Sequence, residues 1–241
     1  MHFFIFIFHD DMKSELGLTP KIDSNLDTNF LKIIGIFSML IDHLGKIFFS
    51  DVIFMQTIGR IAFPLFAYCV VVGSLYTSDI KKYALRLAIF AVLSQPIYAL
   101  ALNRTWSSLN IFFSLLIGLL TIYALKEKKW LLFSAFIIVS LCANLNYGIY
   151  GILLMIIFYL FRHQITLSAI TANSLLISHF FIITPPDFYI NKIGLNIQGF
   201  AILSIPLIYT HTNFNVKINK YLFYIFYPAH LLIFYLIKLI I

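Results

Sequence analysis

Long apolar runs recur along most of this chain, and they constrain its fold more than any other feature. From about residue 30 to the C-terminus, runs near twenty residues follow one another with short polar breaks between them. A helix of about 20 residues crosses the roughly 30 Å of hydrocarbon in a bilayer. Because lipid offers the backbone no hydrogen bonds, each spanning run is expected to be a helix. The pattern predicts an all-α fold, a polytopic integral membrane helix bundle.

The composition excludes a water-soluble globular domain. The 241 residues are 61% hydrophobic and only 11% charged, whereas a soluble domain has about 25% charged residues. The net charge of +7 is spread over short loops without a dense basic cluster, so we expect no nucleic-acid partner. Cys69 and Cys142 fall inside apolar runs and are expected to be small buried hydrophobic residues, with no disulfide or metal site.

We predict about nine spans, with eight or ten as alternatives because the fifth run is short. The predicted spans cover residues 30–49, 53–76, 80–100, 109–125, 130–144, 147–162, 165–184, 195–210 and 221–240. Together they form one transmembrane domain, residues 30–241, and a polar N-terminal extension, residues 1–29, precedes it outside the bilayer. Residues 1–8 are apolar but too short to span, and they lack the basic start and cleavage site of a signal peptide. Either Met1 or Met12 is the true start.

Positive charges predict which ends of the spans face the cytoplasm. Basic residues follow the second, fourth and sixth spans and precede the ninth, at Lys81, Lys82, Arg86, Lys126, Lys128, Lys129, Arg162, Lys217 and Lys220. Because the spans alternate in direction, these loops all lie on one side of the membrane. Cytoplasmic loops are enriched in lysine and arginine, so this side is predicted to be the cytoplasm, and the N-terminus lies there too.

The first span contains polar residues whose spacing points to a function. Lys32 and His43 are eleven residues apart, which is almost three helical turns, so both side chains lie on one face, roughly 16 Å apart. Lys32 lies near the predicted cytoplasmic end, and His43 lies past the middle with Asp42 beside it. An ionisable residue at that depth costs on the order of 2.5–3.5 kcal/mol, which makes it a candidate for function.

Each of these residues also has an alternative role. A neutral imidazole beside a carboxylate can act as a general base. Adjacent helical residues point about 100° apart, however, so Asp42 either supports His43 or pairs with Lys46, four residues further on. The Asp42–His43 pair could also be structural, with both groups hydrogen-bonded to neighbouring helices. Lys32 is either a functional cation or one more charge that orients the first span.

Polar side chains on several other spans converge on the outer half of the bilayer. They are Arg60, Gln95, Asn110, Asn146, Tyr147 and His230. Arg60 either points into the bundle or extends to lipid head groups. Gln95 either contacts a substrate or bonds carbonyls freed by the proline that follows it, and Asn110 either contacts a substrate or caps its helix. His230, deep in the ninth span, is either functional or structural.

Six short segments of the chain carry a family resemblance. They follow one another over about residues 30–235: Leu31-Lys-Ile-Ile through Asp42-His-Leu-Gly45, Ile58-Gly-Arg-Ile-Ala-Phe-Pro-Leu-Phe66, Ser94-Gln-Pro96, Asn110-Ile-Phe-Phe-Ser-Leu115, Asn146-Tyr-Gly-Ile-Tyr-Gly151 and Phe226-Tyr-Pro-Ala-His-Leu231. In these segments the chain resembles the TraX family, the membrane-embedded pilin acetylases of conjugation systems. One departure is Asn146, because members of the family often carry aspartate before Tyr-Gly.

The resemblance implies acetyl transfer across the membrane. The family is similar to a larger group of transmembrane acyltransferases marked by lysine or arginine, ten further residues and then histidine, and Lys32 and His43 match that motif. It implies that cytosolic acetyl-CoA acetylates the N-terminal amine of a pilin-like protein, in the inner membrane of a bacterium and without a metal. His43 and Asp42 would be catalytic, Lys32 and Arg60 would contact acetyl-CoA, and the acceptor or oxyanion would be contacted by Gln95, Asn110, Asn146, Tyr147 and His230.

Two other functions stay open at the level of the sequence. The same chemistry could serve O-acetylation of an envelope glycan or lipid. A proton-coupled transporter would use intramembrane lysine, aspartate and histidine as a relay, but transporters often have repeated halves with paired broken helices, and no such repeat is apparent. Neither the acceptor nor the oligomeric state follows from the sequence, and membrane lipids are the other partner expected.

Overall fold

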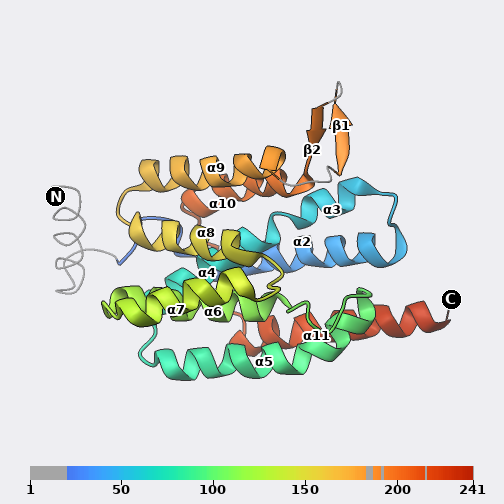
Figure 1. Ribbon diagram of the computed structural model, residues 1–241, viewed down its shortest axis with the longest axis horizontal. Helices are drawn as coiled ribbons and strands as arrows, with labels where there is room; N and C mark the ends of the chain where they lie inside the picture. The colour runs from blue at the N-terminus through green and yellow to red at the C-terminus, as the bar shows by residue number, and fades with distance from the viewer. Residues whose placement is uncertain (1–20, 183–186, 191–192, 215, 241) are drawn as a thin grey trace.

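Helices that run roughly along one common direction build the molecule, and a small hairpin stands at one end (Figure 1). The computed structural model describes residues 21–182, 187–190, 193–214 and 216–240. The elements are α2 (Thr28–Phe48), α3 (Ile53–Gly59), α4 (Ala62–Tyr76), α5 (Ile80–Ala101), α6 (Ile111–Lys126), α7 (Trp130–Cys142), α8 (Gly148–Leu160), α9 (Ile165–Ile182), β1 (Phe188–Ile190), β2 (Ile193–Leu195), the 3-10 helix η1 (Ile197–Ser204), α10 (Ile205–Tyr209) and α11 (Lys220–Ile240).

The fold is a helical membrane bundle, which confirms the predicted fold class. Three helical segments in the described part of the chain are long and apolar enough to cross a bilayer: Ile53–Tyr76, Ile80–Ala101 and Tyr221–Ile240. Shorter apolar helices fill the space beside them. Large apolar side chains also point outward, and Leu131 is 86% exposed. A surface of this kind is suited to lipid and not to water.

Two predicted spans differ from the helices that form. The predicted span 53–76 is divided into α3 and α4, which meet at a turn around Arg60 and Ile61. Pro64 lies in the first turn of α4, and its lack of an N–H prevents a continuous ladder of backbone bonds through this point. The predicted span 195–210 is replaced by η1 and the short α10, and β1 pairs with β2 as an antiparallel hairpin just before it.

The helix starts follow capping residues that are visible in the sequence. Asp27, Asp79 and Asn110 each accept a hydrogen bond from a backbone N–H in the first turn of α2, α5 and α6. Side-chain oxygens of this kind satisfy donors that have no partner inside the helix. The starts of these helices are therefore fixed locally, before any tertiary contact is considered.

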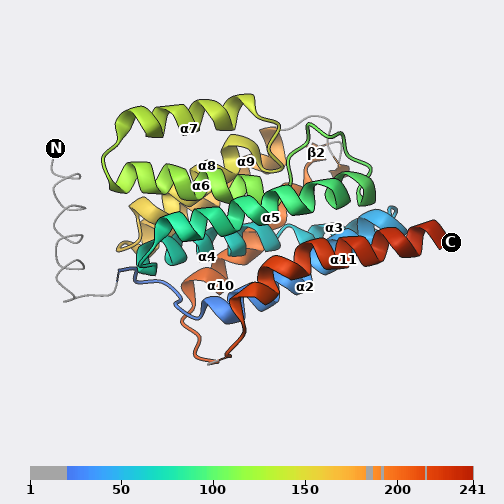
Figure 2. The same ribbon diagram turned by 90° about the horizontal axis from the view of Figure 1, so that it is seen from below.

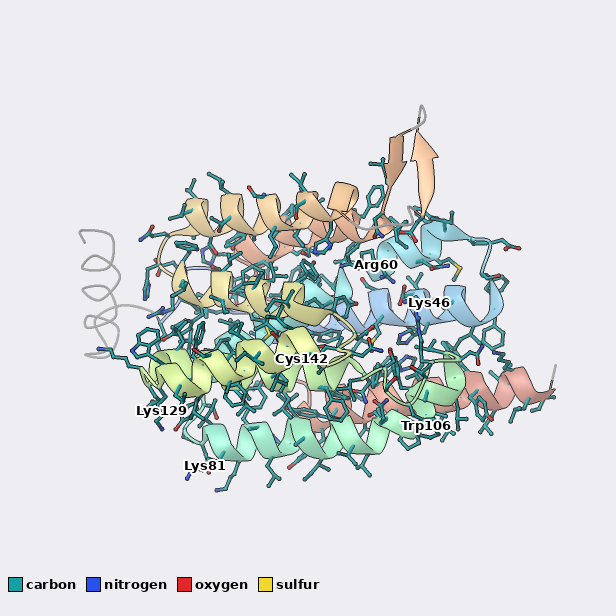
Figure 3. The ribbon with its side chains drawn as sticks, viewed as in Figure 1. Lys46, Arg60, Lys81, Trp106, Lys129 and Cys142 are labelled. Atoms are coloured by element: carbon teal, nitrogen blue, oxygen red, sulfur yellow. The ribbon has the colours of Figure 1, made fainter. Side chains whose placement is uncertain are left out.

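The connections that carry most of the basic loop residues lie together at one end of the bundle, which we call the basic end. They join α4 to α5, α6 to α7 and α8 to α9, and the segment that leads into α11 lies there too (Figures 1 and 2). Figure 3 shows Lys81 and Lys129 at this end, whereas Lys46, Arg60 and Trp106 lie toward the other. The structure thus places these basic connections at one end of the bundle, as the alternating direction of the spans predicts.

Helix α4 forms the centre of the packed core. Nearly all of its residues are buried, and it contacts α2, α6, α8 and η1. Gly151 lets α8 approach closely, because a Cβ at this position would lie 2.5 Å from the Phe63 ring. Helix α11 packs against α5 and α2. Cys69 is buried in α4 as predicted, but Cys142 is exposed at the end of α7, a helix in which Ser140 is the buried residue among the described ones.

The last residues before α2 pack against the basic end. Of the predicted extension, residues 1–20 lie outside the described residues. Ile22 and Asn25 are buried, and the Asn25 side chain donates to the Leu207 carbonyl at 3.1 Å and to Thr212 Oγ1 at 3.0 Å. Tyr68 of α4 donates its hydroxyl to the Asn25 carbonyl at 2.8 Å. Asn25 therefore ties the entry of α2 to the exit of α10.

Replacement of this asparagine is expected to loosen the basic end. In Asn25→Ala, the Leu207 carbonyl and the Asp27 N–H lose their side-chain partners, and the free energy of unfolding should fall by about 2 kcal/mol. Denaturant titration of the protein in detergent measures this change. Asn213→Ala, at an exposed asparagine, is the matched control. Equal stability of the two variants would contradict the role given to Asn25.

Candidate functional site

Two cavities lie between the helices, and they share part of their walls. The basic-end cavity, of about 490 Å³, lies between α2, α4, α5, α6 and α11 and contains Lys32 and Arg86. The polar cavity, of about 310 Å³, lies nearer the opposite end and contains Asp42 and His43. Met39, Ile111 and Tyr227 line both cavities. These three side chains form the partition between the two spaces.

Asp42 is the centre of the charged groups in the polar cavity. One of its oxygens, Oδ2, lies 2.5 Å from Lys46 Nζ, and the other, Oδ1, lies 2.5 Å from the Arg60 guanidinium. Asp42 itself is only 6% exposed. A carboxylate removed from water needs such partners, because burial of an unpaired charge is very costly.

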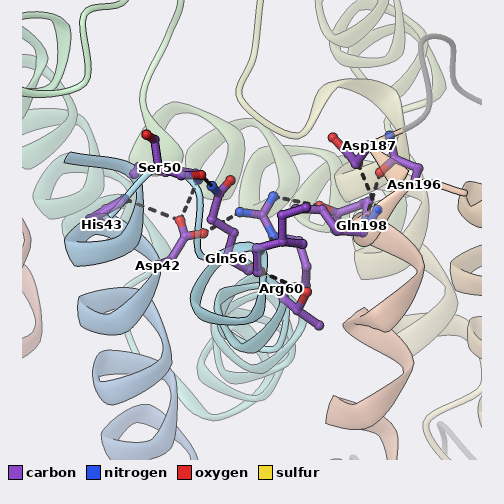
Figure 4. Close-up of polar contacts among 12 residues, drawn as sticks. Asp42, His43, Ser50, Gln56, Arg60, Asp187, Asn196 and Gln198 are labelled. Carbon is purple, nitrogen blue, oxygen red and sulfur yellow. Dashed lines mark hydrogen bonds and ion pairs between the residues drawn. The ribbon is translucent and has the colours of Figure 1, made fainter. Parts of the chain in front are cut away.

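Local structure brings these three charges together. Lys46 follows Asp42 by one helical turn in α2, which places the two side chains on the same face. Gly59 ends α3 directly against Asp42, and a Cβ there would lie 2.2 Å from the Asp42 Cβ. Arg60 then turns toward the carboxylate at the break between α3 and α4 (Figure 4). The break that interrupts the predicted second span is thus what aims the guanidinium inward.

The rest of the Arg60 guanidinium is held from two further elements. Its Nε donates to the Gln56 carbonyl in α3 at 3.0 Å. Another nitrogen donates to the Gln198 side chain in η1 at 3.2 Å. Asp187 and Asn196, which lie beside Gln198 in Figure 4, also line the polar cavity. Arg60 therefore links α2 and α3 to a segment that lies 138 residues away.

His43 forms a second polar contact, on the side of α11. Its Nδ1 lies 2.7 Å from His230 Nε2, and the two rings are nearly parallel, at 9°. His230 Nδ1 lies 2.7 Å from the Phe226 carbonyl oxygen. The remaining nitrogen of His43, Nε2, is 3.9 Å from Asp42 Oδ2. Both histidines are buried, at 6% and 4% exposure.

The predicted site residues divide into four groups in the structure. Asp42, His43, Arg60, Asn146 and Tyr147 all line the polar cavity. His230 does not line the polar cavity but contacts His43 from α11. Lys32 lines the basic-end cavity, with its Nζ 5.2 Å from the centre of the Phe223 ring. The fourth group, Gln95 and Asn110, lines neither cavity.

Gln95 and Asn110 instead form a hydrogen-bonded helix cap. Gln95 Oε1 accepts from the backbone N–H and the side-chain amide of Asn110, at 3.1 and 2.9 Å. Asn110 also donates to the Ala91 carbonyl at 2.7 Å and caps α6. Of the two roles considered for each residue, the geometry supports the structural one and not contact with a substrate or oxyanion.

The basic-end cavity is positively charged. Lys32 and Arg86 line it, and none of the described residues around it is acidic. Arg86 lies over the Tyr83 ring, and its Nε is a buried donor without a hydrogen-bond partner. The sequence predicts Arg86 only as one of the basic residues that orient the loops. Its position one and a half turns inside α5 is the signal that distinguishes it from Lys81 and Lys82.

Other charged residues of the polar cavity were not predicted as site residues. The sequence predicts Lys46 only as an alternative partner of Asp42, and no pattern in it gives Arg104 or Asp187 a role in the site. Both loop residues line the polar cavity. Their positions depend on how the loop after α5 and the segments beside the hairpin are placed relative to the helices, and no local pattern in the sequence indicates this.

The fold and the cavities define an integral membrane protein that holds paired charges and paired histidines inside its helix bundle. The TraX protein family matches residues 27–238, so the chain belongs to the TraX family, and the resemblance seen in its motifs is confirmed.

Two relatives can be compared with it. "Probable fimbrial assembly protein FimC, serogroup H1" of Dichelobacter nodosus is 26% identical over 231 residues, which cover 83% of this chain and 91% of that protein. "Uncharacterized protein RP591" of Rickettsia prowazekii (strain Madrid E) is 29% identical over 147 residues, or 57% of either chain. No solved structure is significantly similar to the chain.

Loss of the Asp42 carboxylate is expected to destabilise the bundle strongly. Asp42→Asn leaves Lys46 and Arg60 inside the protein without their counter-charge, and removal of one partner from a buried ion pair costs about 3–5 kcal/mol. Denaturant titration in detergent measures the loss. Asp51→Asn, an exposed aspartate beyond the end of the same helix, should change stability by less than about 0.5 kcal/mol. A loss below about 1 kcal/mol for Asp42→Asn would contradict this account.

Proposed function

We propose that this chain is an integral-membrane acetyltransferase that moves acetyl from acetyl-CoA to the N-terminal amine of a pilin-like protein. The observation that supports this most directly is the pair of cavities that meet at Met39, Ile111 and Tyr227. One cavity contains cations suited to an anionic donor, and the other contains a buried histidine. The acetyl group at the end of the long arm of acetyl-CoA would have to pass only this partition to move from the basic-end cavity to the polar cavity.

The basic-end cavity is the proposed entrance for the donor. Acetyl-CoA carries phosphates that cannot cross lipid, so it must approach from the side on which it is made. The basic loops lie at this same end, and such loops face the cytoplasm. Lys32 and Arg86 would contact the phosphates, and the apolar and tyrosine walls would hold the arm. We therefore also propose that the protein lies in the inner membrane of a bacterium with its N-terminus in the cytoplasm.

The polar cavity is the proposed place of transfer, and His43 is the proposed general base. The neutral amine attacks the thioester carbonyl carbon, the new C–N bond forms, and the C–S bond breaks. His43 takes the proton from the amine nitrogen and returns it to the departing CoA thiolate, so that free CoA and the acetylated amine are released. Asn146 and Tyr147 line the cavity and offer donors to the carbonyl oxygen as its negative charge develops.

Charge in the polar cavity also suits this chemistry. Lys46 and Arg60 lie on either side of Asp42, so two cations face one carboxylate before Arg104 and Asp187 are counted. A positive field stabilises the oxyanion of the acyl-transfer intermediate. Arg60 is held by three different groups and would act in place, with little reorganisation during the reaction. This assigns Arg60 to the oxyanion and leaves donor binding to Lys32 and Arg86.

The relatives guide the proposed acceptor. The chain belongs to the TraX family, which the resemblance in the motifs links to pilin acetylation, and one relative is named as a probable fimbrial assembly protein. A fimbrial subunit with a free N-terminal amine is the acceptor consistent with both. The test uses purified protein in detergent with isotope-labelled acetyl-CoA, a pilin-like peptide with a free N-terminus, and the same peptide with a blocked N-terminus.

Mass spectrometry should find the label on the N-terminal nitrogen of the free peptide only. Label on a hydroxyl of the blocked peptide, or on an added envelope glycan, would replace the amine acceptor with an O-acetyl acceptor. The absence of any donor consumption with all acceptors would overturn the acetyltransferase proposal and favour the transporter.

Substitution of the proposed base separates chemistry from donor binding. In His43→Gln, kcat should fall at least about 100-fold, because general base catalysis contributes roughly 10²–10⁴, whereas the affinity for acetyl-CoA should change less than about threefold. Steady-state kinetics and equilibrium binding of the labelled donor measure the two effects. His211→Gln, at an exposed histidine, is the control. A wild-type kcat for His43→Gln would remove His43 from the mechanism.

Neutralisation of the basic-end cavity should weaken donor binding alone. Lys32→Met and Arg86→Met are each expected to raise KM for acetyl-CoA about tenfold, the effect of losing one charged contact worth about 1.5 kcal/mol. Acetyl-pantetheine, which lacks the nucleotide phosphates, should show no such change. Lys81→Met provides an exposed control five residues earlier in α5. Equal effects on the two donors would show that neither cation contacts the phosphates.

A further inference from the structure

A chain of two imidazoles begins at His43, which lines the polar cavity, and ends on a backbone carbonyl of α11. It runs from His43 Nδ1 to His230 Nε2 and from His230 Nδ1 to the Phe226 oxygen, with 2.7 Å at each step. Each distance is short enough for a full hydrogen bond. The chain joins α2 to α11, and His230 itself lies outside the lining of the polar cavity.

The carbonyl fixes where the protons lie along this chain. A carbonyl oxygen can only accept, so His230 Nδ1 must carry the hydrogen of that bond. In the neutral ring, Nε2 of His230 is then a bare acceptor. The neighbouring Nδ1 of His43 must therefore donate to it, and Nε2 of His43 is left with a free lone pair. The proton positions follow from geometry and from one acceptor that cannot change its role.

The opposite tautomer of His43 has a competing attraction. If Nε2 carried the hydrogen, it would face Asp42 Oδ2, which lies only 3.9 Å away. That carboxylate favours the wrong proton position for a general base, because Nε2 would then have no lone pair to accept a proton. The two cations on Asp42, Lys46 and Arg60, reduce its attraction for Nε2–H. The short bond to His230 opposes it directly.

We propose that His230 is a positioning residue that holds His43 in the tautomer with hydrogen on Nδ1 and the lone pair on Nε2. The catalytic consequence rests on the proposed function, but the proton positions themselves do not. This role differs from the contact with the acceptor or oxyanion that the family resemblance implies for His230. It acts through His43 and has no contact of its own with the substrate.

Packing around His230 keeps its ring in the required orientation. The ring lies against Phe226 with centroids 4.9 Å apart, and Phe234 meets it edge-on at 5.8 Å. Tyr227 lies on another side, with its centroid 5.9 Å from that of His230. A ring enclosed in this way cannot turn over and exchange its two nitrogens without moving its neighbours. The acceptor presented to His43 is therefore fixed.

The same arrangement persists when His43 takes up a proton. The added hydrogen goes to Nε2, so Nδ1–H continues to donate to His230 throughout. The resulting charge lies beside Asp42, and the nearby cations Lys46 and Arg60 oppose it. This opposition helps His43 return the proton to the thiolate instead of retaining it.

The first experiment observes the tautomer directly and needs no activity. Nitrogen-15 NMR of histidine-labelled protein distinguishes a ring nitrogen that carries hydrogen from a bare one, and the signals that disappear in His43→Gln assign the residue. In the neutral wild type, hydrogen is expected on Nδ1 of His43. In His230→Phe, which keeps the ring volume but removes the acceptor, a substantial fraction should move to Nε2. In His230→Gln, whose amide oxygen can accept, it should return to Nδ1.

The second experiment follows the same variants by kinetics. His230→Phe should lower kcat about 100-fold, within the range that a general base contributes, and should leave KM for acetyl-CoA within about twofold. His230→Gln should recover kcat to within about tenfold of the wild type. His211→Gln serves as control, and thermal unfolding in detergent verifies that each variant is folded.

The outcomes separate this inference from the proposed function. Hydrogen on Nε2 in the wild type, or a tautomer unchanged in His230→Phe, would overturn the positioning role even if acetyl transfer is found. The expected tautomers without any transfer would leave the positioning role intact and remove the acetyltransferase. Loss of kcat that His230→Gln does not restore, with an unchanged tautomer, would assign His230 a purely structural role.

Discussion

The carboxylate of Asp42 is the contact on which the polar cavity depends. It faces Lys46 within α2 and Arg60 at the break between α3 and α4, and Arg60 reaches onward to Gln198 in η1. Three separate parts of the chain are thereby joined through one buried negative charge. Gly59 makes this possible, because any side chain there would occupy the space of the carboxylate. Ionic contacts join the wall of the polar cavity, whereas apolar packing joins the surrounding core.

The His43–His230 pair depends on the ionic cluster around Asp42, although the two histidines lie on the α11 side of α2 and Arg60 lies at the break between α3 and α4. Asp42 is close enough to attract Nε2 of His43, and the two cations beside Asp42 moderate that attraction. The bond to His230 then decides the orientation of the proton. One carboxylate therefore serves two purposes, since it stabilises Arg60 in the cavity wall and sets the electrostatic surroundings of the imidazole. A substitution at either side is felt at the other, so single variants in this region are not additive.

The sequence predicted local features well and distant contacts poorly. Apolar runs predicted the helices, and the spacing of Asp42 and Lys46 allowed their pairing, because both depend on residues within a few turns. Pro64 did not suffice to predict the break at Arg60, since a proline inside a transmembrane helix is also compatible with a continuous, kinked span. The partner of Arg60 in η1 and the contact between His43 and His230 join residues well over one hundred positions apart. Such pairs follow from packing alone.

The partition between the two cavities has a consequence for the membrane itself. Met39, Ile111 and Tyr227 are only 6%, 6% and 2% exposed, so buried and mainly apolar side chains separate the two cavities. A bilayer that stores energy as an ion gradient is discharged by any open aqueous path, and each elementary charge that crosses loses about 2.3 kcal/mol per 100 mV. Buried apolar side chains at this level would oppose such a path between the basic-end cavity and the polar cavity.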